Sequence, residues 1–250
     1  MKRVYNYIKS DISKFGDKLH VFKENKCHQA VTVDLRKIYN PPCYDQGNSS
    51  SCTANSCIFL VEFQLHKETN EDFMGSRLFV YYNERLIEND VSEDGGAMVC
   101  DSIKSISDYG VCLETEWPFD ISKITDKPTD ICYTDALKYK CDKFRHVNQT
   151  FNQILAALVQ GCPITFGTTL YDSFNNVKAD GIVPMPDTVN ESVLGGHCMN
   201  ICGWTGEKFI VRNSWGPDWG DNGYCYFDKE YILNPDLSSD FWIVLDMEHC

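Results

Sequence analysis

The sequence predicts an α+β fold in which a helical half precedes a β-rich half. Three segments between residues 50 and 110 have apolar side chains at helical spacing, and a fourth lies at 150–163. After residue 163 the pattern changes to short β-like runs separated by Gly, Pro, Asn and Asp. We therefore expect two packed lobes with a cleft between them, where binding sites are usually found.

The predicted helices are bounded by residues that favour helix ends. Ser76 and Thr150 suit N-caps, and Gly110 is expected to end a helix in the left-handed conformation. The predicted helices span residues 52–68, 76–88, 97–110 and 150–163. The predicted strands lie within 30–38, 163–170, 195–204, 207–215 and 223–228.

Composition excludes several classes of protein. The 250 residues are 43% hydrophobic, which is enough for a packed core, and the net charge is -13. So acidic a surface repels nucleic acid and anionic membranes, and neither is expected as a partner. No run approaches the roughly 18 apolar residues that a transmembrane helix needs. The N-terminus lacks the apolar run of a signal peptide, so we expect a soluble protein that is not secreted by the usual route.

The cysteine content is high for a reducing compartment. Thirteen cysteines leave at least one thiol outside any intramolecular pairing, and some of the others are candidates for disulfides. Cys198 and Cys202 lie beside His197, but no second pair of ligands follows at the spacing of a zinc site. We expect neither a metal nor another cofactor.

Cys52 lies in the polar stretch "YDQGNSSSCTANS" at the expected start of the first helix. The positive end of the helix dipole favours a thiolate there, and a nearby imidazole would activate it further. Of six histidines, His197 is the strongest candidate because Gly195 and Gly196 before it would let another chain come close. Asn213 follows 16 residues later and can orient the imidazole.

The order and spacing of these residues resemble those of the papain-like cysteine peptidases. Cys52 and His197 are 145 residues apart, within the roughly 130–150 typical of that family. The segments "DQGNSSSC", "GGHCMNICGW" and "NSWGPDWGDNGY" match family motifs, and the likeness runs from about Val33 to the C-terminal "FWIV". The chain looks most similar to the short form found in bacteria and large DNA viruses. The resemblance implies a papain-like fold with a helical left lobe and a β-rich right lobe.

The resemblance also implies the roles of the site residues. Cys52 would be the nucleophile, His197 the base and later the acid, and Asn213 the residue that orients His197. Gln46 would form the oxyanion hole with the Cys52 backbone N–H. Trp215 would shield the bond between Asn213 and His197 from water. Trp219 would extend the same wall or the leaving-group side; both tryptophans could instead be plain aromatic core.

The segment "SEDGGAMVC" at 92–100 resembles the part of the family that binds substrate backbone as an extended strand. Gly95 and Gly96 permit a close approach. Met98 would enter the main specificity pocket and favour an apolar side chain. The alternative is a turn before a helix.

The sequence departs from the better-known members in two places. Ser49 stands where the family often has a cysteine, so the usual disulfide of this loop is doubtful, and Thr53 replaces an aromatic residue. Residues 1–30 are too short for the family's long helical prosegment. They could still lie in the cleft and inhibit, or form a tail that does not. We therefore expect an extension over 1–30 and a peptidase domain over 31–250.

The leading function is that of a cysteine-type endopeptidase acting on peptides or proteins through an acyl-thioester on Cys52. One alternative is an acyltransferase or transglutaminase that passes the acyl group to an amine. Another is a non-catalytic peptide-binding or virion protein on the same fold. The expected location is cytoplasmic or, for a viral chain, within the virion.

Overall fold

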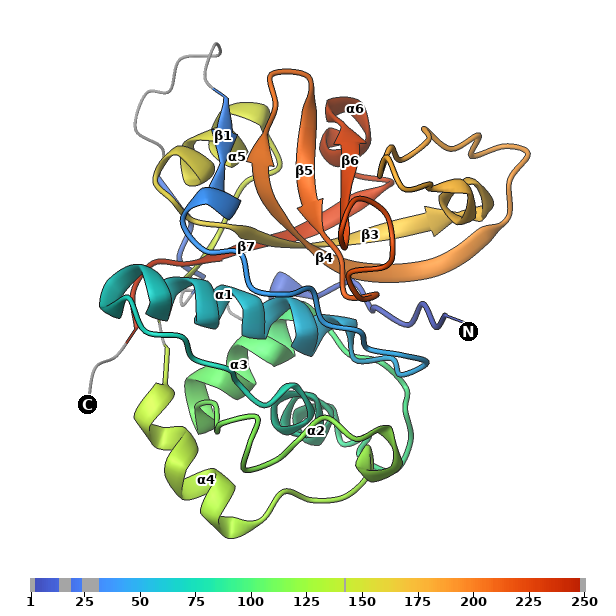
Figure 1. The fold of residues 1–250 in the computed structure, drawn as a ribbon. Coiled ribbons are helices and arrows are strands. Elements are labelled where there is room, and N and C mark those ends of the chain that lie inside the picture. The colour runs from blue at the N-terminus through green and yellow to red at the C-terminus, as the bar shows by residue number, and fades with distance from the viewer. Residues whose placement is uncertain (1–2, 14–18, 24–31, 142, 248–250) are drawn as a thin grey trace.

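The computed structural model describes residues 3–13, 19–23, 32–141 and 143–247. Figure 1 shows helices gathered in one lobe and an antiparallel sheet in the other, which confirms the predicted α+β, two-lobed fold. The helices of the first lobe are α1 (Cys52–Thr69), α2 (Arg77–Glu88), α3 (Val99–Tyr109) and α4 (Asp130–Ala136).

The second lobe is built on one antiparallel sheet. Its strands follow the order β2-β7-β3-β4-β5-β6, and β1 pairs with β4. Two helices, α5 (Phe151–Val159) and α6 (Lys229–Leu233), belong to this lobe. The strands are β1 (Val33–Asp34), β2 (Phe144–His146), β3 (Ile164–Tyr171), β4 (Val193–Trp204), β5 (Lys208–Arg212), β6 (Tyr224–Asp228) and β7 (Ser238–Val244).

Helix α1 lies between the lobes and belongs to both cores (Figure 1). Phe59 and Phe63 pack with the sheet, whereas Ile58 and Val61 pack with the other helices. Because apolar side chains surround it, the helix is buried from Cys52 to Leu65. Its N-terminus is therefore held rigidly at the junction of the lobes.

The predicted helix boundaries are largely confirmed. The Ser76 side chain accepts a hydrogen bond from the backbone N–H of Phe79, and that of Thr150 accepts one from Gln153. Gly110 has φ 78° but ψ -158°, so the predicted left-handed cap is wrong. A Cβ at this glycine would lie 1.9 Å from the Ala136 carbonyl oxygen, so close packing explains its presence.

The predicted strand at 30–38 is wrong for most of its described length. Only Val33 and Asp34 form β1, and Leu35–Lys37 form a 3-10 turn. The Asp34 side chain accepts a hydrogen bond from the Arg36 backbone N–H, which favours the turn over a strand. Residues 30 and 31 lie outside the described part of the chain.

Arg212 ties the sheet to the loop that leads into α1. Its guanidinium donates hydrogen bonds to the carbonyl oxygens of Pro41 (2.8 Å) and Pro42 (2.7 Å) and lies 4.6 Å from the centre of the Phe59 ring. We expect Arg212→Leu to lower the free energy of unfolding by about 2–4 kcal/mol, because it leaves both carbonyls without their donor. Urea denaturation would measure the loss.

The control for this stability prediction is Lys138→Leu. The Lys138 side chain is 63% exposed and pairs with Asp135 on the surface, so its replacement is expected to cost less than about 0.5 kcal/mol. Equal losses of unfolding free energy in the two variants would show that the buried contacts of Arg212 do not stabilise the fold.

Candidate active site

Cys52 is the first residue of α1 and is completely buried. The backbone N–H groups of Cys52 and Thr53 at the helix N-terminus, and that of Cys198 on β4, act to lower the pKa of its thiol. These donors favour a thiolate. They also place the thiol against the residue that follows His197.

Hydrogen bonds hold the loop before Cys52 in shape. The Ser49 hydroxyl donates to the Gln46 carbonyl oxygen (2.7 Å), and the two hydroxyls of Ser49 and Ser51 are 2.7 Å apart. Asn55, one turn into α1, donates its side-chain amide to the Ser51 carbonyl oxygen at 2.8 Å. This network occupies the place where the family often has a disulfide.

The Gln46 side chain is fully buried and fixed at both ends. Its Oε1 accepts a hydrogen bond from the Ser214 hydroxyl (2.5 Å), and its Nε2 donates to the Ser49 carbonyl oxygen (2.8 Å). An amide nitrogen carries two hydrogens, so one N–H is left beyond the bond to Ser49. The structure thus holds a directed donor within the loop that precedes Cys52.

His197 and Asn213 form the predicted pair. The imidazole Nε2 lies 2.8 Å from Asn213 Oδ1, and the other ring nitrogen, Nδ1, is buried without a hydrogen-bond partner among the described residues. The Ser214 backbone N–H donates to the same Asn213 oxygen at 2.8 Å, which fixes the amide with its carbonyl toward His197. Nδ1 is therefore the nitrogen available for a proton from a thiol.

An aromatic wall covers this pair. The Trp215 ring lies 5.0 Å from the His197 ring, centre to centre, at 32°. Trp219 stands edge-on to Trp215 at 5.1 Å and stacks on Phe174 at 5.6 Å. The Trp215 ring thus covers the His197 ring, and Trp219 packs against Trp215 and Phe174. The shielding role expected of Trp215 stays a prediction.

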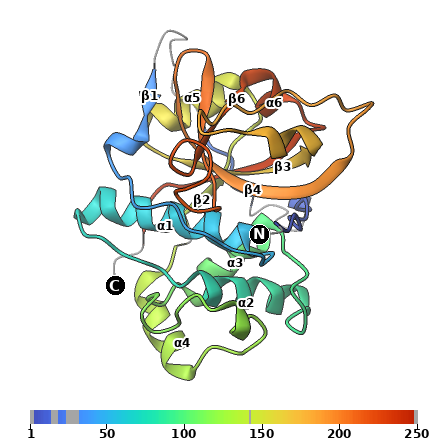
Figure 2. The ribbon, with the colours of Figure 1, turned by 45° about the vertical axis from the view of Figure 1, so that its right-hand side comes forward.

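Residues 3–8 of the N-terminal extension lie across this site, at the junction of the lobes (Figures 1 and 2). The Tyr7 backbone N–H donates to the Gly196 carbonyl oxygen (3.0 Å), and the Ile8 N–H donates to that of Ala97 (3.1 Å). Asn6 pairs with Gly196, and Ile8 with Met98, as parallel β-bridges. The extension therefore joins the two lobes as a strand would.

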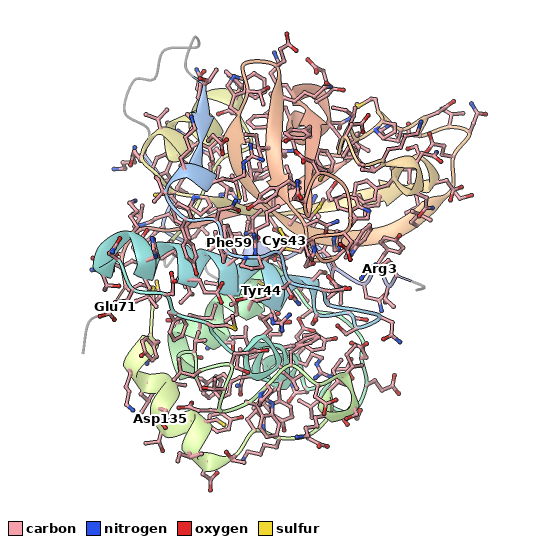
Figure 3. The ribbon with its side chains drawn as sticks, in the orientation of Figure 1. Arg3, Cys43, Tyr44, Phe59, Glu71 and Asp135 are labelled. Atoms are coloured by element: carbon pink, nitrogen blue, oxygen red, sulfur yellow. The ribbon has the colours of Figure 1, made fainter. Side chains whose placement is uncertain are left out.

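The side chains at the start of the extension lie against His197 and Trp215. Tyr5 stands edge-on to the rings of His197 (6.4 Å) and Trp215 (5.8 Å). The Arg3 guanidinium lies 5.3 Å from the centre of the Trp215 ring and donates to the carbonyl oxygens of Trp215 and Gly47 and to Asp45 Oδ1. In Figure 3, Arg3 projects at the boundary between the lobes.

The glycines flanking the site make room for this segment. A Cβ at Gly96 would lie 2.0 Å from the Asn6 carbonyl oxygen, and Cβ atoms at Gly195 and Gly196 would each lie 2.3 Å from a carbonyl oxygen of the extension. The close approach expected at these three positions is thus present, with the extension as the approaching chain. Gly95 differs, because its Cβ would meet the Asp90 side chain.

Met98 is the N-cap residue of α3, and it contacts the extension through its β-bridge with Ile8. Tyr7 of the extension packs its ring against the sheet, where a Cβ at Gly167 would lie 2.0 Å from Tyr7 Cζ. Its hydroxyl hydrogen-bonds with Asp240 and Ser239 of β7, which no sequence motif had marked. In the sequence, tyrosines flank Asn6 on both sides, at Tyr5 and Tyr7. The extension has no helical or strand pattern from which their role could be predicted.

Burial governs the ionisation of Cys52 and His197. Loss of solvent raises the pKa of the Cys52 thiol to about 12. Burial, together with the positive charge of Arg3, lowers the pKa of His197 to about 4, against the opposing effect of the bond to Asn213. With the extension in place, both groups are therefore neutral near pH 7.

Other predicted features concern the cysteines and the membrane. No disulfide joins two cysteines of the described ranges, so the predicted disulfide is not confirmed there; Cys27 and Cys250 lie outside those ranges. Among the described residues, no three His, Cys, Asp or Glu side chains are grouped to hold a metal. None of the described helices is long and apolar enough to cross a membrane.

Comparisons with known proteins agree with this geometry. Residues 29–239 match the family described as "Papain family cysteine protease". An uncharacterised peptidase C1-like protein of Acanthamoeba polyphaga mimivirus is 40% identical over 231 residues, which cover 86% of this chain and 74% of the relative. Cysteine proteinase 3 of Entamoeba histolytica is 27% identical over 208 residues, covering 80% of this chain and 63% of that protein.

Solved structures show the same fold. Xylellain, a cysteine protease from Xylella fastidiosa, superposes with a TM-score of 0.89 at 34% identity, covering 99% of both chains. Digestive procathepsin L 3 of Tenebrio molitor superposes with a TM-score of 0.74 at 20% identity, covering 91% of this chain and 74% of that one.

Proposed function

The chain belongs to the papain family of cysteine proteases, and from this premise we propose how its site hydrolyses peptide bonds. It is a cysteine-type endopeptidase whose substrates are peptides or proteins. Two observations carry the mechanism: the imidazole of His197 is held by Asn213 under Trp215, and the buried Cys52 thiol at the N-terminus of α1 packs in the same cluster as Cys198, which follows His197 in the sequence.

The proposed reaction has two halves. His197 takes the proton of the Cys52 thiol, and the sulfur attacks the carbonyl carbon of the substrate. The C–N bond then breaks, the amine leaves with the proton from His197, and an acyl-thioester remains. In the second half His197 takes a proton from water, which attacks the thioester. The C–S bond breaks, the acid leaves, and His197 returns the proton to the Cys52 sulfur. Both tetrahedral oxyanions would accept hydrogen bonds from Gln46 Nε2 and the Cys52 backbone N–H.

Labelling of the intact, reduced protein with a peptide epoxide, followed by mass spectrometry and a peptide-hydrolysis assay, tests this function. We expect one adduct, on Cys52, and acid and amine products from the unlabelled enzyme. Transfer of the acyl group to an added amine in preference to water would favour the acyltransferase or transglutaminase alternative. A site that neither labels nor turns over would favour the non-catalytic, peptide-binding alternative.

Asn213→Ala is expected to lower kcat about tenfold, because one hydrogen bond orients the imidazole and is lost. The alkaline limb of the pH–rate profile should also move to lower pH, because His197 loses a partner that favours its charged form and its pKa falls. Asn222→Gly, an exposed position with φ 53°, is the control and should leave kcat unchanged. Equal kcat values for the two variants, with equal urea midpoints, would contradict the role of Asn213.

We also propose that residues 1–30 form an intramolecular inhibitor of a peptidase domain over 31–250. Support comes from Tyr5 on His197, from Tyr7 and Ile8 hydrogen-bonded to opposite walls of the cleft, and from Phe22, whose buried ring anchors the extension beside His146 of β2. A substrate backbone would lie where the extension lies, along Gly96 and Met98 on one side and Gly196 on the other. Trp215 and Trp219 would form the end of that path.

Hydrogen exchange measured on the full chain tests the inhibitor. The amides of Tyr7 and Ile8 should be protected in the free protein and should exchange freely once a peptide epoxide occupies Cys52, because both ligands need the same walls. Protection that persists in the labelled protein would place the extension outside the substrate path.

The location of the protein stays a prediction: cytoplasmic or, for a viral chain, within the virion.

A further inference from the structure

The carboxylate of Asp94 ties the loop before Cys52 to the helical lobe. Its two oxygens accept hydrogen bonds from the Ser50 backbone N–H at 3.0 and 3.1 Å, and the Ser50 hydroxyl donates to the Asp94 carbonyl oxygen at 2.9 Å. Ser50 is buried, so water does not readily replace the carboxylate as the partner of this N–H. Because a charged acceptor makes a stronger hydrogen bond than a neutral one, the contact fixes the direction of the N–H.

Helix α2 holds this carboxylate in place from the other side. The Tyr81 hydroxyl donates to Asp94 Oδ1 and accepts from the Gly96 backbone N–H at 3.2 Å. The Arg85 guanidinium lies 4.0 Å from the centre of the Tyr81 ring and donates to the Glu93 carbonyl oxygen. The side chains of Tyr81 and Arg85 are both buried. The packed interior of the helical lobe therefore sets the position of Asp94.

The peptide group between Ser49 and Ser50 connects Asp94 to the proposed oxyanion hole. Its N–H donates to Asp94, and its carbonyl oxygen accepts from Gln46 Nε2 at 2.8 Å. A trans peptide is planar, so its N–H and C=O point in opposite directions and can only turn together. The carboxylate at the N–H also polarises the group and strengthens the bond at its carbonyl. A rotation of this peptide would therefore move the acceptor that fixes the Gln46 amide.

We propose that Asp94 is a positioning residue for the oxyanion hole: by fixing the peptide between Ser49 and Ser50, it directs the second N–H of Gln46 Nε2 at the oxyanion of the substrate. The inference rests on the proposed peptidase function and adds a residue to the same site. Ser49 cannot form the disulfide that often holds this loop in the family, so hydrogen bonds take that role in this chain. Asp94 acts through Gln46 and not on the reacting atoms.

Two reactions of the full chain separate oxyanion stabilisation from thiol reactivity. Peptide hydrolysis passes through tetrahedral oxyanions, whereas in alkylation by iodoacetamide the Cys52 sulfur displaces iodide and no oxyanion forms. The Asn6 amide of the extension donates to the Ser50 hydroxyl (2.9 Å), so a change at Asp94 can also alter the closed fraction. Both reactions need an open cleft, so this effect cancels in the ratio of kcat/KM for hydrolysis to the rate constant for Cys52 alkylation. We expect Asp94→Ala to lower that ratio about tenfold or more.

The conservative variant and a neighbouring acid are the controls. Asp94→Asn keeps an oxygen that can accept from Ser50 and Tyr81, so the ratio should stay within about threefold of that of the unaltered chain. Glu93→Ala removes a negative charge from the adjacent exposed residue and should leave the ratio unchanged. If Asp94→Ala does not fold, Tyr81→Phe takes its place, with an expected fall of about threefold. An unchanged ratio in Asp94→Ala, or an equal fall in Glu93→Ala, would overturn the proposal.

A double variant tests whether Asp94 acts through Gln46. Gln46→Ala alone is expected to lower the ratio roughly 100–1000-fold, because one oxyanion donor is lost. Adding Asp94→Ala should then lower the ratio by less than about twofold, since the amide that the carboxylate positions is already gone. Losses that multiply in the double variant would show that Asp94 supports the site by another route, against the proposal.

A spectroscopic measurement keeps this inference apart from the peptidase function. In the full chain, the NMR signals of the Gln46 side-chain amide report its bond to Ser49 whether or not a peptide is hydrolysed. These signals should shift in Asp94→Ala and stay in place in Asp94→Asn and Glu93→Ala. That outcome without any hydrolysis would support the positioning of Gln46 and remove only the proposed function. Gln46 signals that stay in place in all three variants would overturn the inference.

Discussion

Peptide hydrolysis by the Cys52→Ala variant is expected to fall by about 100,000-fold or more, to the level that binding and the oxyanion donors alone provide. The nucleophile forms the covalent intermediate, so no neighbouring group replaces it. Alanine keeps the helix N-terminus, and the sulfur is already enclosed, so we expect the fold to persist. The measurement is kcat/KM on a peptide substrate, with adduct formation by a peptide epoxide as a second readout.

The matched control is Cys57→Ala, which removes another buried thiol from the same helix. Its activity and its epoxide adduct should remain, with at most a modest loss of stability from the small cavity. If Cys57→Ala lost activity as completely as Cys52→Ala while both remained folded, Cys52 would not be the nucleophile. Residual hydrolysis within tenfold of the unaltered enzyme in Cys52→Ala would lead to the same conclusion.

Arg3→Asp is expected to raise the rate of peptide hydrolysis by the full chain about 100-fold. The substitution removes an ion pair with Asp45, two hydrogen bonds to backbone carbonyls and the cation over Trp215, and it places like charges beside each other. Their combined loss shifts the equilibrium toward an open cleft. Lys9→Asp makes the same change of charge in an exposed part of the extension and is the control.

The pH dependence of alkylation distinguishes the closed and open forms. In the closed chain the pKa of Cys52 is raised to about 12 and that of His197 is lowered to about 4, so the thiol is neutral between them and its alkylation should rise steeply only at alkaline pH. Opening rehydrates both groups and removes the charge of Arg3, which lowers the first pKa and raises the second. Arg3→Asp should therefore add a reactive plateau near neutral pH. An identical pH profile in both chains would contradict this account.

The proposed catalytic residues could be selected from the sequence because each lies inside a local motif with fixed spacing. Cys52 follows a polar loop and opens a strongly apolar helix, and Asn213 lies 16 residues after His197, directly after the neighbouring strand β5. The boundaries of α2 and α5 were predictable from Ser76 and Thr150 because a cap is a contact between residues close in sequence.

The place where the Tyr7 side chain packs was not predictable, because the residues around it come from distant parts of the chain. Gly167 and Asp240 meet only through the pairing of β3 with β7, and β7 was not predicted as a strand. Short elements such as β2 and α4 were also missed, since their few residues carry too little periodicity to be distinguished from loops. The path of the extension depends on backbone hydrogen bonds, which no side-chain pattern encodes.

The continuity of the chain between Tyr7 and the anchored Phe22 has a consequence for regulation. An inhibitor carried on the same polypeptide is present at a fixed effective concentration, so the closed fraction does not change when the protein is diluted. In the unaltered chain, a competing substrate or a break between the segment in the cleft and the domain would change that fraction. After such a break the segment becomes an ordinary ligand, and dilution alone then switches the enzyme on.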